Sequence, residues 1–179
     1  MIKKISLSIS IIITVMFFSG CAPTAVLPVL FIPKDIEMSK EPVASQDFSV
    51  KVTLEKENVE GYITANNFQI ALTESIKRAN LFGSENTKPF ELSANVYKAS
   101  RPSAGLTMTS ELCANYVLSQ EKKNIWSKDI CYKGVANLDE SFFGASRSLM
   151  AFNRANHGHM TLLISSLREY LTSRLQLSK

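Results

Sequence analysis

Hydrophobic and polar residues alternate between Asp47 and Leu54, where apolar side chains occupy every second position. A period of two with β-branched residues is typical of a half-buried strand. After residue 66 the period becomes helical, and Asn66 with Gln69 three residues later matches a capping-box start. Gly83 suits the end of this helix. Its predicted buried stripe consists of Phe68, Leu72, Ile76 and Ala79.

Three more strands and a long helix are predicted downstream. The strand-like runs cover residues 90–97, 106–119 and 124–136, and the charged link Glu121-Lys122-Lys123 between the last two suits a hairpin turn. The long helix is expected to begin at Asp139 or Ser141, because acidic residues favour a helix N-terminus. Gly158 weakens its middle by about 1 kcal/mol relative to alanine. The buried side of this helix is predicted at Leu149, Phe152, Ala155, Leu163, Leu167 and Tyr170.

The order strand, helix, three strands, helix predicts an α+β fold. An antiparallel sheet of about four strands, with both helices on one face as a two-layer sandwich, is the simplest way to bury these apolar stripes. Hexapeptide repeats, which would build a left-handed β-helix, are absent from the sequence. A chain of 179 residues suits one folded domain, which we expect to span residues 47–179.

Two cysteines fix the expected register of the hairpin. Cys113 and Cys131 are centred on Lys122, the middle of the charged link, so both signals place the two cysteines opposite each other. The face that carries Leu112 and Ile130 is the more apolar, and we assign it to the helices. An oxidising compartment would join the cysteines as a disulfide. Two reduced, partly buried thiols are the alternative, with metal binding or redox catalysis a minor one.

The N-terminal segment has the layout of an export signal. Lys3 and Lys4 precede an apolar stretch that ends at Phe18. Phe18-Ser19-Gly20-Cys21 resembles the lipobox of bacterial lipoproteins, although Leu is usual where Phe18 stands. The resemblance implies that residues 1–20 are a signal peptide and that Cys21 is lipidated as the first residue of the mature chain. A signal peptide cleaved elsewhere and an uncleaved anchor are the alternatives.

Removal of the signal changes the charge of the protein. Lys3 and Lys4 leave with it, so the 20 basic residues fall to 18 against 16 acidic ones, and the net charge falls from +4 to +2. No clustered basic face remains, and nucleic acid is therefore excluded as a partner. Because Ala22 rather than Asp follows the cysteine, the lipoprotein resemblance points to the periplasm-facing side of the outer membrane, with the inner membrane as the alternative.

A tether is predicted between the lipid and the domain. Residues 21–46 contain four prolines and no sustained period, which is typical of an extended segment. The apolar run from Leu27 to Ile32 also fits an alternative in which this part lies on the domain or on a partner. We therefore expect a lipid bilayer, held through acylated Cys21, as one partner.

No pattern in the sequence indicates a catalytic, cofactor-binding or metal site. His157 and His159 would point about 200° apart on a helix, so we interpret them as structural or solvent-facing. No GxSxG elbow and no glycine-rich phosphate loop is present. Tyr116 and Trp126 are expected to pack in the core. Lys122, Lys123 and Arg101 lie in turns or loops and are the candidates for partner contact.

The succession of elements over residues 47–175 resembles small envelope lipoproteins. The lipopolysaccharide-assembly lipoprotein of the LptE type and the auxiliary lipoproteins of lipid transporters of the PqiC type look similar in architecture, which implies a class of function and no site residue. Locally, the segment from Phe143 to Asn156 is similar to one in small uncharacterised proteobacterial lipoproteins, some labelled UDP-N-acetylglucosamine acyltransferases. The missing hexapeptide repeats argue against that label for this chain.

These features predict a non-catalytic accessory or assembly subunit of a cell-envelope complex, or of a lipid or lipopolysaccharide pathway. Its protein partner would bind at a sheet edge, the exposed sheet face or the hairpin turn. Two alternatives remain open. An acyltransferase or hydrolase acting on envelope glycolipid or peptidoglycan would need a pocket with convergent polar groups. A lipid-binding carrier would need a dry cavity behind Leu118 and Trp126.

Overall fold

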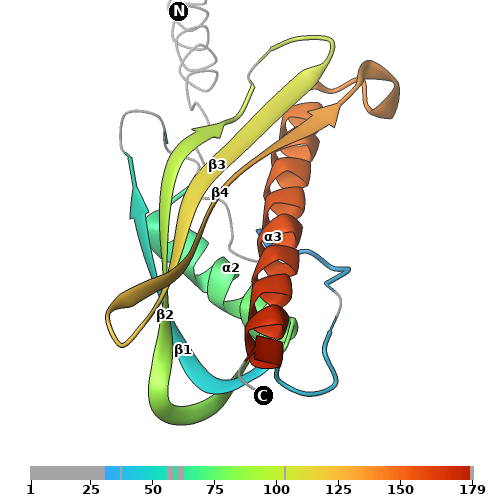
Figure 1. The fold of residues 1–179 in the computed structure, drawn as a ribbon. Coiled ribbons are helices and arrows are strands. Elements are labelled where there is room, and N and C mark those ends of the chain that lie inside the picture. Colours follow the sequence, from blue (N-terminus) through green and yellow to red (C-terminus); the bar gives the residue numbers. More distant parts are fainter. Residues whose placement is uncertain (1–30, 37, 56–58, 60–62, 103, 178–179) are drawn as a thin grey trace, which may run out of the picture.

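A four-stranded sheet carries two helices on one face (Figure 1). The computed structural model describes residues 31–36, 38–55, 59, 63–102 and 104–177. The sheet has the order β1-β2-β3-β4, and a short 3₁₀ turn, η2, precedes the last helix. The elements are β1 (Ala44–Leu54), α2 (Ala65–Arg78), β2 (Phe82–Ser100), β3 (Met108–Gln120), β4 (Lys123–Ala136), η2 (Leu138–Glu140) and α3 (Gly144–Leu177).

The structure confirms the α+β class and the order of elements, but the sheet is mixed rather than antiparallel. β1 runs parallel to β2, with Val50 opposite Leu92, while β2, β3 and β4 are antiparallel to one another. The reason is α2, which returns the chain to the end of the sheet where β1 began. An alternating pattern tells which face of a strand is buried, but it does not tell the strand's direction.

The first helix has the predicted buried stripe and different ends. Its four predicted apolar residues, from Phe68 to Ala79, are all fully buried. The N-cap is Thr64 rather than Asn66, and its side chain accepts a hydrogen bond from the backbone N–H of Asn67. At the other end, Asn80 adopts a positive φ of 52° and turns the chain into β2, so Gly83 lies inside a strand and does not end the helix.

The hairpin register is confirmed from Met108 to Leu118. Cys113 faces Cys131 and Leu118 faces Trp126, as the centring on Lys122 requires. Beyond that point one residue of β4 is extra, because Ser119 pairs with Asn124. The turn is therefore two residues long, Glu121 and Lys122, with φ values of 51° and 63°. Such positive angles match the right-handed twist of the flanking strands.

The last helix begins later than expected. Residues 138–140 form a separate 3₁₀ turn and Ser141 is extended, so α3 starts at Gly144. The predicted buried side holds for Phe152, Ala155, Leu163 and Leu167, and Tyr170 is half-buried, whereas Leu149 is 36% exposed. Gly158 has a packing reason, because a Cβ there would lie 2.1 Å from the ring of Tyr132 on β4.

Part of the segment expected to be a tether joins the core. Phe31 is fully buried, with its ring 5.8 Å from that of Phe152 and 6.4 Å from that of Phe68, and Ile32 is also buried. The docked alternative thus applies to these two residues, and β1 begins at Ala44, before residue 47. Among the described residues, no helix is both long and apolar enough to cross a membrane.

Candidate functional site

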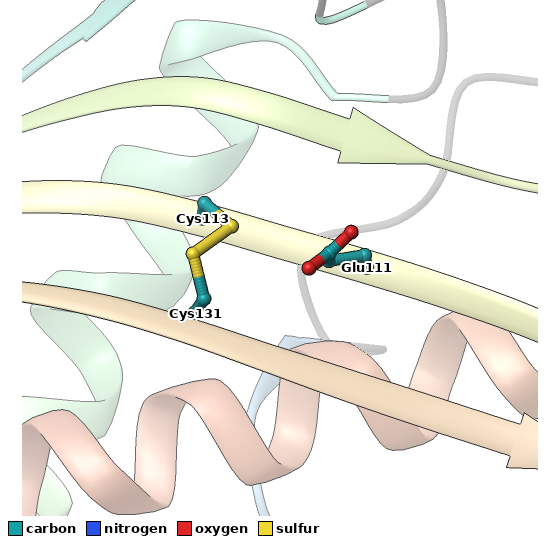
Figure 2. Close-up of side chains that lie close together, drawn as sticks. All are labelled: Glu111, Cys113 and Cys131. Carbon is teal, nitrogen blue, oxygen red and sulfur yellow. A yellow bond between two sulfur atoms is a disulfide. The ribbon is translucent and has the colours of Figure 1, made fainter.

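The two strand cysteines are joined on the sheet face that points away from the helices. Cys113 and Cys131 form a disulfide across β3 and β4, with their Cα atoms 4.1 Å apart (Figure 2). Glu111 lies beside them, and the three side chains together form a compact group of metal-ligand types. A disulfide sulfur is no longer a thiolate, which is the form that binds metal. In the disulfide form the group therefore offers a cation only one carboxylate.

That carboxylate already has cationic neighbours. Lys98 lies 2.7 Å from Glu111 and Lys133 lies 3.9 Å from it, and the hydrogen bond from Lys98 lowers the pKa of Glu111. On the neighbouring strand the Tyr97 hydroxyl donates to Asp129 at 2.9 Å. Partial desolvation and then this hydrogen bond raise the pKa of Tyr97. The exposed face near the disulfide is thus a set of polar groups paired with one another.

The buried polar pair lies on the opposite face, under α3. The hydroxyl of Tyr116 is 2.7 Å from Nε2 of His159, and Nδ1 of His159 is 3.2 Å from the carbonyl oxygen of Leu112. Burial lowers the pKa of His159 to about 4 and raises that of Tyr116. A neutral imidazole that donates from Nδ1 to the carbonyl and accepts at Nε2 from Tyr116 satisfies every group. Both side chains are buried, which is the position expected for Tyr116 and one of the two expected for His159.

The aromatic residues expected in the core pack there or at its margin. Tyr116 is fully buried, while Trp126 is half-buried, with its ring 6.2 Å from that of Tyr170. A lipid carrier would need a cavity behind Leu118 and Trp126. Leu118 is fully buried in the same hydrophobic cluster.

A groove of about 200 Å³ lies near the hairpin turn. Arg174 of α3 forms one wall, where it donates to Gln120 at 2.8 Å and lies over the ring of Phe90 at 5.7 Å. Its lining combines apolar side chains with amides and this guanidinium: Ala44, Gln46, Phe90, Gln120, Leu171, Arg174 and Leu175. The groove suits an apolar side chain that carries an acceptor or a negative charge.

The structure separates the three residues predicted for partner contact. Lys122 and Lys123 lie at the β3–β4 turn, at the opposite end of the hairpin from the start of α3 (Figure 1). Arg101 lies at the other end and donates to the hydroxyl of Ser148 on α3 at 3.2 Å. The 13 residues of β3 between these ends span about 40 Å.

Sequence reasoning missed another basic residue near the turn. Lys88 lies 3.2 Å from Glu121, and its carbonyl accepts from Gln120. Strand β2 begins eight residues before the predicted strand. These additional residues are mostly polar and do not alternate, so the sequence pattern did not indicate that Lys88 belongs to a strand near the turn.

A patch of exposed apolar side chains at the start of α3 was also missed. Phe142 is 88% exposed, Phe143 77% and Leu106 72%, and Leu138 is partly exposed. We call these four residues the apolar tip. The predicted helix start at Asp139 or Ser141 had placed both phenylalanines inside a helix, where one face would be covered. The delayed start of α3 leaves them in a loop.

The predicted lipidation site, Cys21, lies outside the described residues. Its role rests on the sequence pattern alone.

Comparison with known proteins identifies a fold and no family. No protein-family model matches the sequence, and no curated protein matches it. The protein XCC0632 from Xanthomonas campestris, of the family DUF330, superposes with a TM-score of 0.58 over 80% of this chain and 95% of that one, at 10% identity.

Two other solved structures superpose less well. PelC from Paraburkholderia phytofirmans, solved as a dodecamer, gives a TM-score of 0.49 at 10% identity over 74% of this chain and 92% of that one. Lipoprotein GNA1162 from Neisseria meningitidis gives 0.42 at 11% identity over 72% of this chain and 99% of that one. At 10% identity the likeness to XCC0632 shows a shared fold alone, and residue roles do not transfer.

Proposed function

We propose that the protein is a lipid-anchored lipoprotein of the cell envelope, held at the periplasm-facing side of the outer membrane. The observation that carries the proposal is Phe18-Ser19-Gly20-Cys21, placed directly after a basic and then apolar leader. Ala22 is the basis for choosing the outer membrane. Each buried methylene of an acyl chain contributes about 0.8 kcal/mol, so several chains on Cys21 anchor the domain stably.

The disulfide supports this location. Disulfides form and persist in the periplasm, whereas cytosolic thiols are kept reduced. With Cys113 and Cys131 joined and Cys21 acylated, all three cysteines of the chain have a role. The likeness of fold to XCC0632 supports the choice of a compact α+β domain behind the anchor.

We further propose that the domain acts as an accessory subunit that binds an envelope protein at the hairpin end. Lys88, Lys122 and Lys123 outnumber Glu121 there, so the turn favours an acidic surface. The groove beside Arg174 lies at the same end and is lined partly by β1, an edge strand of the sheet. A partner with an apolar side chain next to a carboxylate would fit both features.

Mass analysis of the membrane-extracted protein tests the anchor. We expect an N-terminal peptide that begins at Cys21 and carries acyl chains. A Cys21→Ser variant should not mature to this form. A mature N-terminus at another residue, or an unmodified Cys21, would overturn the anchor.

Crosslinking in membranes tests the accessory role. The lipidated protein should recover an envelope complex in fixed stoichiometry, and Lys122→Glu with Lys123→Glu should lower this recovery by about tenfold or more through charge reversal at the contact. Lys51→Glu, an exposed reversal on the outer face of β1, is the matched control and should leave recovery unchanged. A solitary monomer with hydrolase or transferase activity would contradict the proposal.

A further inference from the structure

The apolar tip is built from two loops that meet at one end of the domain. Leu106 lies in the loop between β2 and β3, and Phe142 and Phe143 lie in the loop between η2 and α3 (Figure 1). Phe142, Phe143 and Leu106 are each more than 70% exposed, and Leu138, in η2 beside them, is 39% exposed. Adjacent phenylalanines with most of their surface in water are costly, because each buried aromatic ring removes a large apolar area from water.

A buried arginine fixes these loops to each other. Arg147, in the first turn of α3, donates from Nη1 to the carbonyl of Ser141 at 2.5 Å and from Nη2 to the carbonyl of Gly105 at 2.9 Å. Ser141 precedes Phe142, and Gly105 precedes Leu106. The hydroxyl of Thr107 also donates to the side chain of Asn137 at 3.3 Å. The tip is therefore presented by a defined framework, and binding need not first order it.

The entry of the chain into the domain indicates what covers the tip. Phe31 packs beside Phe152, which follows Phe143 by nine residues, or about 14 Å along α3. Phe31 lies ten positions after Cys21, and a chain of that length spans up to about 35 Å. A bilayer that holds Cys21 is thus within reach of the tip. Phenylalanine and leucine are among the side chains with which proteins that bind a membrane surface enter the boundary between head groups and acyl chains.

We propose that the apolar tip inserts into the bilayer that anchors Cys21, so that the domain stands on the membrane by a second contact. This inference rests on the proposed lipid anchor. Phe142 and Phe143 enter the interfacial region, Leu106 and Leu138 flank them, and Arg147 holds the two loops in place. The β3–β4 turn, at the other end of the hairpin, then points away from the lipid.

A fluorescent reporter on the full lipidated protein tests the proposal. With Cys113 and Cys131 joined and Cys21 acylated, a Phe142→Cys variant offers one thiol for an environment-sensitive NBD label. The labelled protein is placed in vesicles of phosphatidylethanolamine and phosphatidylglycerol, with and without brominated acyl chains. A Thr172→Cys variant is the matched control, since this exposed residue lies about 43 Å further along α3 than Phe143.

The expected result is a shift of NBD emission to shorter wavelength at position 142, with quenching by the brominated lipids, and neither change at position 172. Equal emission at both positions in protein that floats with the vesicles would overturn the tip contact and leave the anchor intact. A blue shift without quenching would mean that a second copy or another protein covers the tip, and would also overturn it. Labelling of the wild-type chain, or failure to float with vesicles, would instead refute the anchor.

Discussion

The buried pair of Tyr116 and His159 makes stability depend on pH, and most of the effect lies above the pH at which ordinary carboxylates take up protons. In the unfolded chain His159 takes up a proton near its ordinary pKa of 6.5, whereas in the folded protein burial lowers that pKa to about 4. The unfolded state therefore binds more protons as pH falls through this window. Stability is fully present above pH 6.5 and is progressively lost between about pH 6.5 and pH 4.

The size of this loss follows from the two pKa values. Between pH 7.5 and pH 5.0, preferential protonation of the unfolded chain at one such histidine lowers the free energy of unfolding by about 2 kcal/mol. Protonation of His159 breaks its hydrogen bond with Tyr116, because Nε2 of an imidazolium carries a proton and can no longer accept one from the Tyr116 hydroxyl. The cost is concentrated where α3 packs on β3.

Urea unfolding at pH 7.5 and at pH 5.0, followed by circular dichroism, measures the effect. His159→Gln replaces the titrating ring with an amide that can accept from Tyr116, and we expect it to be less stable at pH 7.5 but to lose the pH dependence. His157→Gln, two residues away on the same helix and not fully buried, is the control and should retain the wild-type dependence. If wild type and His159→Gln lose equal stability between the two pH values, the reasoning is wrong.

Three further predictions concern the packing of β4 against α3, the disulfide and the apolar tip. Gly134→Ala would place a Cβ 2.1 Å from the carbonyl oxygen of Ala151, so we expect a loss of about 1–3 kcal/mol in urea unfolding, whereas Gly144→Ala, with its nearest contact at 3.6 Å, should be close to neutral. Replacing both Cys113 and Cys131 by alanine should lower stability by about 3 kcal/mol on the chain-entropy model, and non-reducing mass analysis of the parent should show two hydrogens fewer than the dithiol. Arg147→Met should free both loops of the apolar tip, seen as faster amide exchange at residues 105–107 and 141–143 with little change in the β3–β4 hairpin; unchanged exchange in these loops would show that Arg147 does not hold them.

The hairpin was predictable because two independent signals coincided. The cysteines and the charged link gave the same centre, and the pairing of Cys113 with Cys131 and the burial of Leu112 and Ile130 follow from it. The extra residue in β4 near Ile125 left no trace in that pattern, because a bulge changes the register without changing the residue types around it. The turn therefore closes on two residues where a three-residue link was expected.

The direction of β1 and the start of α3 depend on tertiary structure. The alternation in β1 is the same for a parallel or an antiparallel neighbour, and only the crossover through α2 decides between them. At α3, Asp139 and Glu140 suit a helix N-terminus, and Glu140 instead pairs with Arg154 and accepts from the backbone of Asn137. Those contacts lower the pKa of Glu140 to about 2 and fix η2 as a separate turn.

The candidate site was the least predictable part. Lys122 lies in the turn as predicted, and Lys123 beside it is the first residue of β4. A sequence does not show that Arg101 lies at the far end of the same strands, where its guanidinium contacts Ser148. The exposure of Phe142 and Phe143 was hidden for the same reason as the helix start, since apolar residues next to a helical pattern are usually buried by it.

The length of α3 gives the domain the properties of a rigid spacer. Its 34 residues measure about 51 Å, and β3 and β4 run beside it and pack against it, so neither layer can bend alone. The domain therefore keeps a fixed distance between a structure bound at the first turn of α3 and a partner bound at the β3–β4 turn. Adding or removing residues in α3 alone would make the helix longer or shorter than the hairpin on which it packs. The lengths of the helix and the hairpin are therefore expected to vary together among proteins that share this arrangement.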